Sequence, residues 1–295
     1  MALFDTGSQP YDAASMDVLD SLRTTRSWVN YNPGPPFDFV GGQHPATEAQ
    51  LTEELGRLHA AGFRGLVTNA VAFGLERAPD IAKQVGFDHV VAKIWWQDDE
   101  LLATEKANLD TVNDAVDAVC VGNEIIQKGI ADHDGLVREV DAARSRWGRP
   151  VTTGFQPPDW ELYPDLATEV GDFSFLNVHP WWVVLRNDPL TAANWVAEAY
   201  HCVAATPGIA DDRLVVVQET SFPSGAVPPE LAPGATPANE KRFYEALLAT
   251  DVPFVWFVAV DSPLHRKVSP PGGFGGLWDE HWKPKPVVEL LASAL

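Results

Sequence analysis

The sequence predicts a single (β/α)8 (TIM) barrel that occupies residues 1–295, with residues 1–24 forming an N-terminal extension before the first strand. Three observations support this fold. Short apolar segments rich in β-branched residues recur eight times. Amphipathic segments with helical spacing separate most of them, as in a parallel sheet whose strands are connected by helices. No linker rich in Gly, Ser or Pro divides the chain, and 295 residues is an ordinary length for one barrel.

The expected elements alternate along the chain. Strands are expected at 27–31, 65–69, 89–95, 118–124, 150–155, 174–180, 214–220 and 253–261. Helices are expected at 47–61, 71–84, 98–116, 134–146, 191–206, 237–249 and 285–294. Thr47 and Gln50 form a capping box that opens the first of these helices, and Gly62 ends it. Pro79 falls within the second helix, where its ring opposes helix continuation.

The longest loops are expected at the end of the barrel where ligands bind. Stretches rich in Pro and Gly at 32–45, 221–238 and 268–276 each follow a predicted strand. In a (β/α)8 barrel these loops lie on the C-terminal face of the strands, which carries the active site in characterised enzymes of this fold.

Composition excludes several classes of partner. A formal net charge of −20 argues against nucleic acid and anionic membranes, and no apolar stretch approaches the ~20 residues of a membrane span. No basic segment followed by an apolar one opens the chain. We therefore expect a cytoplasmic protein if the chain is complete, and a secreted one if it has been trimmed. The two cysteines, Cys120 and Cys202, are expected to be reduced and structural.

Cofactor motifs are missing from the sequence. No Gly-x-Gly-x-x-Gly or Walker-type loop precedes a helix, and the eight histidines are scattered without a His-x-x-x-His or His-Glu-x-x-His pair. No Gly-x-Ser-x-Gly segment indicates ester or peptide chemistry. We therefore expect neither a cofactor nor a metal site.

Two glutamates stand at the ends of predicted strands. Glu124 closes the segment Ala-Val-Cys-Val-Gly-Asn-Glu, and Glu219 lies at the end of Leu-Val-Val-Val-Gln-Glu-Thr. Cleavage of a glycosidic bond needs such a pair, because one carboxyl protonates the leaving oxygen while the other acts at the sugar carbon. The alternative is that both acids form salt bridges at the barrel rim.

Four strand-end segments carry a family resemblance. They are Val-Gly-Asn-Glu-Ile at 121–125, Asn-Val-His-Pro-Trp-Trp at 177–182, Gln-Glu-Thr-Ser-Phe-Pro-Ser-Gly at 218–225 and Gly-Phe-Gly-Gly-Leu-Trp-Asp at 273–279. Together and in this order they resemble glycoside hydrolase family 17, the β-1,3-glucanases and related β-glucan transglycosylases. That family carries Val-Gly-Asn-Glu after strand four, Asn-x-Tyr-Pro after strand six and Glu-Thr-Gly-Trp-Pro-Ser after strand seven.

The resemblance implies a retaining O-glycosyl hydrolase of the glucan β-1,3-glucosidase type, which acts on a β-glucan by double displacement. Glu124 matches the general acid/base, whose pKa is expected to be raised by burial or by a like-charged neighbour. Glu219 matches the nucleophile, which must be ionised. Asn123 matches the asparagine before the acid, whose amide can donate to the sugar 2-hydroxyl. His179 stands where the family has a tyrosine. It is expected to donate to the nucleophile or to a sugar hydroxyl, or to serve as a structural histidine.

Aromatic residues near the strand ends are further candidates for contact with sugar rings, on which they can stack. The pairs 95–96 and 181–182 are both Trp-Trp, and at most one member of each pair should face the cleft because side chains alternate along a strand. The expected substrate contacts are Trp95, Trp181, Trp278 and Tyr31.

The chain departs from the family pattern after the last strand. The family commonly has an Asp/Asn-Glu pair there, and the alignment puts Ser262 where the glutamate would stand. This departure leaves the two catalytic carboxylates untouched. It concerns which linkage the enzyme prefers and the balance between hydrolysis and transfer. A transglycosylase with the same residues is one alternative function, and an inactive carbohydrate-binding barrel is another.

Overall fold

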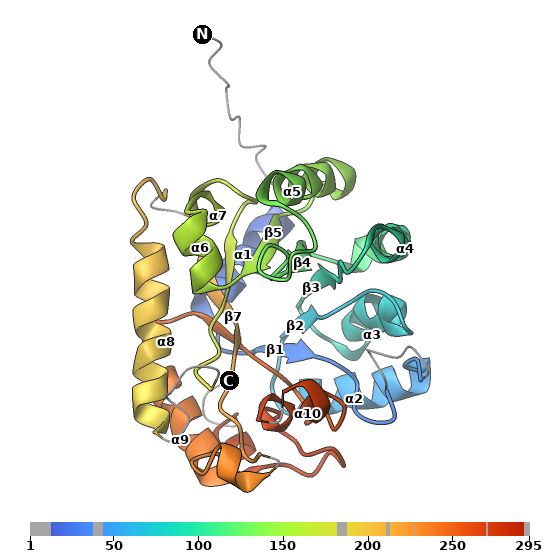
Figure 1. The fold of residues 1–295 in the computed structure, drawn as a ribbon. Helices are drawn as coiled ribbons and strands as arrows, with labels where there is room; N and C mark the ends of the chain where they lie inside the picture. The colour runs from blue at the N-terminus through green and yellow to red at the C-terminus, as the bar shows by residue number, and fades with distance from the viewer. Residues whose placement is uncertain are drawn as a thin grey trace.

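A closed barrel of eight parallel strands forms the centre of the computed structural model (Figure 1), which describes residues 13–37, 44–181, 188–210, 213–226, 228–269 and 271–291. Each strand pairs with the next, and β8 closes the barrel by pairing with β1. The strands are β1 Trp28–Tyr31, β2 Gly65–Thr68, β3 His89–Ile94, β4 Ala118–Asn123, β5 Val151–Phe155, β6 Ser174–Asn177, β7 Val215–Thr220 and β8 Phe254–Trp256. The predicted (β/α)8 fold is confirmed.

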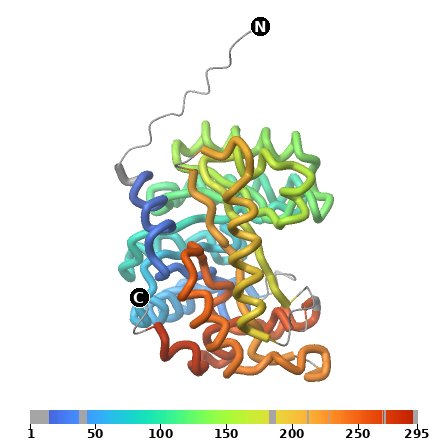
Figure 2. Tube along the Cα trace, turned by 90° about the vertical axis from the view of Figure 1, so that its left-hand side faces the viewer, coloured from blue at the N-terminus to red at the C-terminus, as the bar shows by residue number. Residues whose placement is uncertain are grey.

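Helices form a layer around the strands, and α8 and α9 lie side by side within it (Figure 2). The α-helices are α1 Ala13–Thr24, α2 Glu48–Ala60, α3 Ala78–Val85, α4 Asp99–Val112, α5 His133–Trp147, α6 Pro157–Leu162, α7 Asp165–Thr168, α8 Pro189–Ala204, α9 Pro237–Leu248 and α10 His265–Val268. Short 3-10 helices are η1 Leu75–Arg77, η2 Asn113–Ala115, η3 Pro229–Leu231, η4 Gly272–Phe274 and η5 Pro286–Leu290. Among the described helices, none is both long and apolar enough to cross a membrane.

Two expected helices differ from the prediction. The helix expected at 71–84 is instead a loop, the turn η1 and then α3, which places Pro79 in the first turn of α3. A proline is tolerated there because the first N–H groups of a helix have no partner within it. The helix expected at 285–294 is the 3-10 helix η5, in which Val288 N–H donates to Lys285 O at 3.0 Å. Residues 292–295 lie outside the described residues.

The start of α2 also differs in part. Thr47 caps the helix by accepting from Gln50 N–H, as the capping box predicts. The Gln50 side chain, however, does not return to Thr47. It donates to Gly34 O at 2.8 Å and to Glu54 Oε1 at 3.0 Å, and so ties the loop after β1 to α2.

Helix α1 covers the N-terminal end of the barrel. Its Val18 and Leu22 pack with Trp28 and with inward-facing strand residues in one apolar cluster: Val67, Val91, Ala118, Cys120, Phe173, Phe175, Leu214, Val216 and Val255. The Trp28 ring fills the space beside β2, where a Cβ on Gly65 would lie 2.1 Å from it. This end of the interior is therefore a packed core, and it leaves the opposite end for polar side chains.

The two cysteines occupy different environments, and both are free. Cys120 is buried in the apolar cluster beneath α1, which agrees with a structural role. Cys202 is exposed on α8, so the structural role expected for it is not supported.

Irregular pairing at the C-terminal ends of β4 and β7 changes which side chains face inward. The register shifts between Cys120 and Asn123 on β4, and again on β7 around Gln218 and Glu219. A bulge places consecutive side chains on one side of a strand that would otherwise alternate. Gln218 and Glu219 can therefore both point into the mouth of the barrel.

Candidate active site

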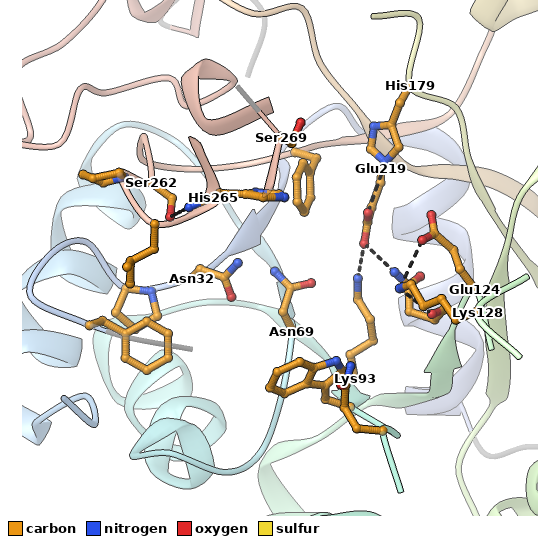
Figure 3. A pocket seen from close by; sticks show the side chains of 18 of the residues that line it. Asn32, Asn69, Lys93, Glu124, Lys128, His179, Glu219, Ser262, His265 and Ser269 are labelled. Atoms are coloured by element: carbon orange, nitrogen blue, oxygen red, sulfur yellow. Dashed lines mark hydrogen bonds and ion pairs between the residues drawn. The ribbon is translucent and has the colours of Figure 1, made fainter. Parts of the chain in front are cut away.

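A cavity of 1110 Å³ opens at the C-terminal mouth of the barrel (Figure 3). Residues at or just after the C-terminal ends of all eight strands line it together with loop residues, among them Asn69, Lys93, Glu124, His179, Glu219 and Phe257. Both predicted catalytic glutamates project into this space. Of the loops expected on the C-terminal face, 32–45 supplies Pro33, Pro35, Pro36 and Phe37 and 268–276 supplies Ser269, whereas Ser262 and Leu264 come from the segment that follows β8.

The backbone after β4 directs Glu124 into the cavity. Gly122 has φ 68° and Glu124 has φ 60°, so both lie in the left-handed region. A side chain at 122 would collide with Ile125, because a Cβ there would lie 2.3 Å from Ile125 Cγ1. Glu124 N–H donates to Gly154 O at 2.8 Å and fixes the turn against β5. A non-glycine residue held at positive φ is uncommon and often marks a functional position.

Three donors hold the Glu124 carboxylate. Gln156 Nε2 and Asn177 Nδ2 donate to Oε1 at 2.6 and 2.8 Å, and Lys128 Nζ lies 3.1 Å from Oε2. Burial and the nearby Glu219 carboxylate raise the pKa of Glu124, but Lys128, His179 and the amide of Gln156 outweigh them. The pKa of Glu124 therefore lies below its ordinary value. The raised pKa expected of a resting general acid is wrong for this state of the site.

The Glu219 carboxylate is surrounded by donors at the floor of the cavity. Lys93 Nζ forms a short ion pair with Oε1, which also accepts from Gln218 Nε2 at 3.1 Å and Asn123 Nδ2 at 3.3 Å. His179 Nε2 lies 3.3 Å from Oε2. Burial raises the pKa of Glu219, but Lys93 and His179 overcome that effect and hold the pKa well below its usual range. Glu219 is therefore ionised, as a nucleophile must be.

Asn123 links the two carboxylates. Its amide nitrogen donates to Glu219, and its Oδ1 accepts from Asn177 Nδ2 at 3.0 Å and Gln218 Nε2 at 3.1 Å. One oxygen of Glu124, one nitrogen of His179 and one oxygen of Glu219 lie within 4.8 Å of one another. The structure thus brings the predicted residues Asn123, Glu124, His179 and Glu219 into one group.

The aromatic candidates divide between the cavity and the core. Trp95 and Trp181 line the cavity, and Trp181 packs on the His179 ring with a centroid distance of 4.5 Å. Trp96 is buried in the core, so the pair after β3 alternates as expected. Trp182 lies outside the described residues.

Tyr31 and Trp278 are corrections to the expected substrate contacts. Tyr31 has no exposed surface, faces α2 and donates to Glu54 Oε2 at 2.7 Å, because its position on β1 points away from the barrel interior. Trp278 is buried in the main core beside Trp282, with a centroid distance of 5.7 Å. Neither side chain lines the cavity.

The comparison with protein families decides the assignment. The family model described as the BtgE/BtgC glycoside hydrolase domain matches residues 29–279, which is most of the chain. The chain belongs to this family. It is therefore a glycoside hydrolase, and the match covers the whole barrel from β1 to the loop after β8.

Solved structures of glycoside hydrolases share the fold at low identity. A family 17 β-1,3-glucanosyltransferase from Rhizomucor miehei is 18% identical, with a TM-score of 0.71, and the match covers 89% of this chain and 97% of that one. An active-site mutant of the Rhizomucor miehei β-1,3-glucanosyltransferase in complex with laminaritriose has a TM-score of 0.72 at 17% identity, with coverage of 89% and 97%. A GH5_18 enzyme from Bifidobacterium longum in complex with Manβ1-4GlcNAc has a TM-score of 0.66 at 16% identity, with coverage of 90% and 77%. No curated protein sequence matches the chain.

Several polar residues of this glycoside hydrolase were missed by sequence reasoning. Lys93 and Lys128 pair with the two glutamates, and Gln156 donates to Glu124. Lys93 carried a signal, because a lysine inside the apolar run of β3 is rarely buried unless it is paired. Asn32, Asn69, Ser262 and His265 lie across the cavity from the glutamates (Figure 3).

The three side chains Glu124, His179 and Glu219 also have the spacing of a possible metal site. Both carboxylates, however, already face an ammonium group, Lys93 at Glu219 and Lys128 at Glu124. A divalent cation at this position would be repelled by both ammonium groups unless it displaced them from the carboxylates. The charges in the site therefore suit acid–base and nucleophilic chemistry better than metal binding.

Proposed function

We propose that this glycoside hydrolase cleaves β-glucan, with β-1,3 linkages as the preferred substrate, by a retaining double displacement. The observation that carries the proposal is the spacing of Glu124 and Glu219, whose nearest oxygens lie within 4.8 Å. Retaining enzymes hold their two carboxyls roughly 5–5.5 Å apart, whereas inverting enzymes need roughly 6.5–9.5 Å to admit a water.

In the first step Glu219 attacks the anomeric carbon while Glu124 donates a proton to the leaving oxygen. The two roles follow from the surroundings of each carboxylate. Glu219 is buried and held ionised by Lys93 and His179, which suits a nucleophile. Glu124 is more open to solvent and stands beside the loop residues of the cavity, where a leaving sugar can reach it.

In the second step Glu124 accepts the proton of an incoming water, whose oxygen bonds to the anomeric carbon as the bond to Glu219 breaks. Two inversions at this carbon leave its configuration unchanged. Asn123, which donates to Glu219 in the free site, is placed to donate to the 2-hydroxyl of the bound sugar in both transition states.

The cavity suits an oligosaccharide. Its volume of 1110 Å³ exceeds the upper end of ordinary small-ligand pockets, roughly 1,000 Å³. Trp95, which is partly exposed, offers an aromatic face, Trp181 and Phe257 form a buried apolar wall behind the cavity surface, and Asn32 and Asn69 offer amide groups for sugar hydroxyls. The complex of the Rhizomucor miehei enzyme with laminaritriose supports a β-1,3-linked glucan as the substrate of this related fold.

A second candidate function is transfer of the glucosyl group to another sugar. The glucanosyltransferase activity of the Rhizomucor miehei structural neighbour favours it. Hydrolysis and transfer share the first step and differ only in whether water or a sugar hydroxyl attacks the glycosyl-enzyme.

The proposal is tested by incubating the protein with laminarin and measuring new reducing ends and oligosaccharide lengths. The Glu219→Gln variant should lose at least ~10²-fold in rate while keeping its fold, because an amide cannot attack the anomeric carbon. Glu53→Gln is the matched control, since Glu53 is exposed on α2 and, among the described residues, forms its ion pair with Arg57 alone. An inactive wild type, or a loss of only a few-fold in Glu219→Gln, would contradict the proposal.

A further inference from the structure

We propose that Lys128 is a positioning residue that blocks the proton-carrying oxygen of Glu124 in the free enzyme and withdraws when a sugar occupies the leaving-group side of the cavity. This inference rests on the proposed function. It adds a condition to it: the acid/base becomes competent only when a sugar is bound next to it.

The two oxygens of Glu124 are not equivalent. Oε1 accepts two N–H groups, from Gln156 at 2.6 Å and from Asn177 at 2.8 Å. A proton on Oε1 would point at these two donors, so the acid proton belongs on Oε2. Oε2 is the oxygen that Lys128 Nζ approaches to 3.1 Å. The ammonium therefore stands where the proton and the leaving oxygen must meet.

The contacts and exposure of Lys128 allow its ammonium to stay beside Oε2 in the free enzyme and to move away when a sugar binds. Its Nζ makes a second contact, with Asn123 O at 3.0 Å, which anchors it beside the acid/base. Its side chain is 42% exposed and lines the cavity, and the residue lies four positions after Glu124 in a turn that the bond from Lys128 N–H to Glu124 O closes at 3.0 Å. A flexible, half-exposed lysine can swing into solvent at small cost, because exposed ion pairs contribute little to stability.

Other charged groups face Glu124 from the surrounding elements, and none of them takes the place of Lys128 at Oε2. They are Glu219 from β7, His179 after β6, Asp159 from α6, Lys93 from β3 through its pair with Glu219, and His265 from α10, which interacts electrostatically with Glu219, His179 and Lys128. Lys128 is the lysine in direct contact with Glu124 among the described residues. Removing it therefore changes the acid/base without removing the support of the nucleophile.

The position of Lys128 affects both steps of the reaction. In the first step a sugar on the leaving-group side displaces Lys128, and Glu124 can then hold a proton and pass it to the leaving oxygen as the glycosidic bond breaks. In the second step the acceptor O–H gives its proton to Glu124 Oε2, its oxygen bonds to the anomeric carbon, and the electron pair of the broken bond returns to Glu219. After the leaving group departs, Lys128 can return to Oε2 and compete with the activation of water. A bound acceptor sugar keeps Lys128 away from Oε2, so the presence of Lys128 favours transfer over hydrolysis.

The test compares Lys128→Met with Lys128→Arg and with Lys241→Met. Methionine keeps the length of the side chain without the charge, and arginine keeps the charge. Lys241 is the matched control, because it forms a comparable ion pair with Glu289 on the surface of α9. The measurements are pH profiles of kcat/KM and kcat on reduced laminari-oligosaccharides, and the ratio of transfer to hydrolysis products.

The expected result is specific to Lys128→Met. The basic limb of its kcat/KM profile, which reports the acid in the free enzyme, should move to higher pH. At a pH on the wild-type limb, kcat/KM should rise by roughly 2- to 5-fold, the effect of one partly exposed ion pair. The basic limb of kcat should move less, because Lys128 has already withdrawn in the complex. The ratio of transfer to hydrolysis should fall by roughly the same factor, and Lys128→Arg and Lys241→Met should follow the wild type.

Two outcomes would overturn the inference, and they are distinguishable. A wild type that does not cleave the oligosaccharides would overturn the proposed function and this inference with it. An active wild type whose kcat/KM limb and product ratio do not respond to Lys128→Met, or respond equally to Lys128→Arg, would overturn this inference alone.

Discussion

Replacing Lys93 by methionine tests how the site keeps Glu219 ionised. The ion pair is buried, with side-chain exposures of 2% for Lys93 and 6% for Glu219. Removing one partner of a buried pair costs about 3–5 kcal/mol, because the remaining charge is left without compensation. His179, Asn123 and Gln218 still face the Glu219 carboxylate, so we expect a loss near the lower end, about 3 kcal/mol in the free energy of unfolding at pH 7.

The pH dependence of this loss has a definite sign. The pKa of Glu219 is lowered in the folded wild type, so the pair contributes stability above the pKa of the unfolded state, about 4.3. That contribution is lost as the pH falls through the folded pKa. In Lys93→Met, burial without the cation should raise the pKa of Glu219. The deficit relative to the wild type should therefore be largest near neutral pH and shrink in acid.

The assay is urea unfolding of a double-mutant cycle made of Lys93→Met, Glu219→Gln and the double variant. A coupling energy of about 2 kcal/mol or more is expected, because the neutral glutamine no longer needs the lysine. The exposed pair Arg57 and Glu53 gives the reference cycle, with expected coupling below about 1 kcal/mol. A loss under about 1 kcal/mol in Lys93→Met, with no coupling, would show that Lys93 does not keep Glu219 ionised.

Three further predictions concern the acid/base, a buried carboxyl and the cavity wall. Glu124→Ala should lose cleavage of laminarin but keep the first step on an activated aryl β-glucoside, and added azide should yield a β-glycosyl azide; an α-azide would contradict the assigned roles. Burial raises the pKa of Glu105 to about 8, although hydrogen bonds from the N–H groups of Val71 and Trp95 lower it. The free energy of unfolding of the wild type should therefore fall as the pH rises from about 4.3 toward 8, by up to about 1.4 kcal/mol per pH unit. Glu105→Gln should reduce this pH dependence of stability when it is measured by thermal unfolding. An unchanged pH dependence would contradict a raised pKa for Glu105. Trp95→Ala should raise KM for laminari-oligosaccharides by roughly 5-fold or more, since stacking contributes about 1 kcal/mol or more, and should also lower Tm because the ring packs on Phe73 and the core; an unchanged KM would remove Trp95 from the site.

Much of the fold could be predicted from the sequence. Apolar runs mark buried parallel strands, and the helical spacing between them marks the outer layer, so each of the eight strands was located. The two glutamates could be placed in one site for the same reason. The C-terminal ends of parallel strands share one edge, and Glu124 and Glu219 each follow such a run.

The details of the site depend on contacts that a linear pattern does not carry. The bulge in β7 turns Gln218 and Glu219 to the same side, which strict alternation excludes. The pairing of Lys93 with Glu219 joins residues 126 positions apart. Tyr31 was misplaced because an aromatic at a strand end can face either the cavity or the helices, and here Glu54 on α2 supplies its partner.

The low pKa of Glu124 shows the same limit. A general acid was expected to have a raised pKa because of burial and a neighbouring carboxylate, and both effects are present. Lys128 and the amide of Gln156 help to lower the pKa by more than these two effects raise it. Sequence spacing alone does not show how strongly either partner acts on Glu124.

The central claim is that Glu219 forms a covalent bond with the sugar. It is tested most directly by incubating the protein with a 2-deoxy-2-fluoro-β-glucosyl fluoride, or its laminaribiosyl analogue, and locating the label by peptide mass spectrometry. We expect one stoichiometric label on Glu219, with turnover restored by an acceptor sugar. A label on Glu124, or no label together with an initial α-configured product from a normal substrate, would contradict it.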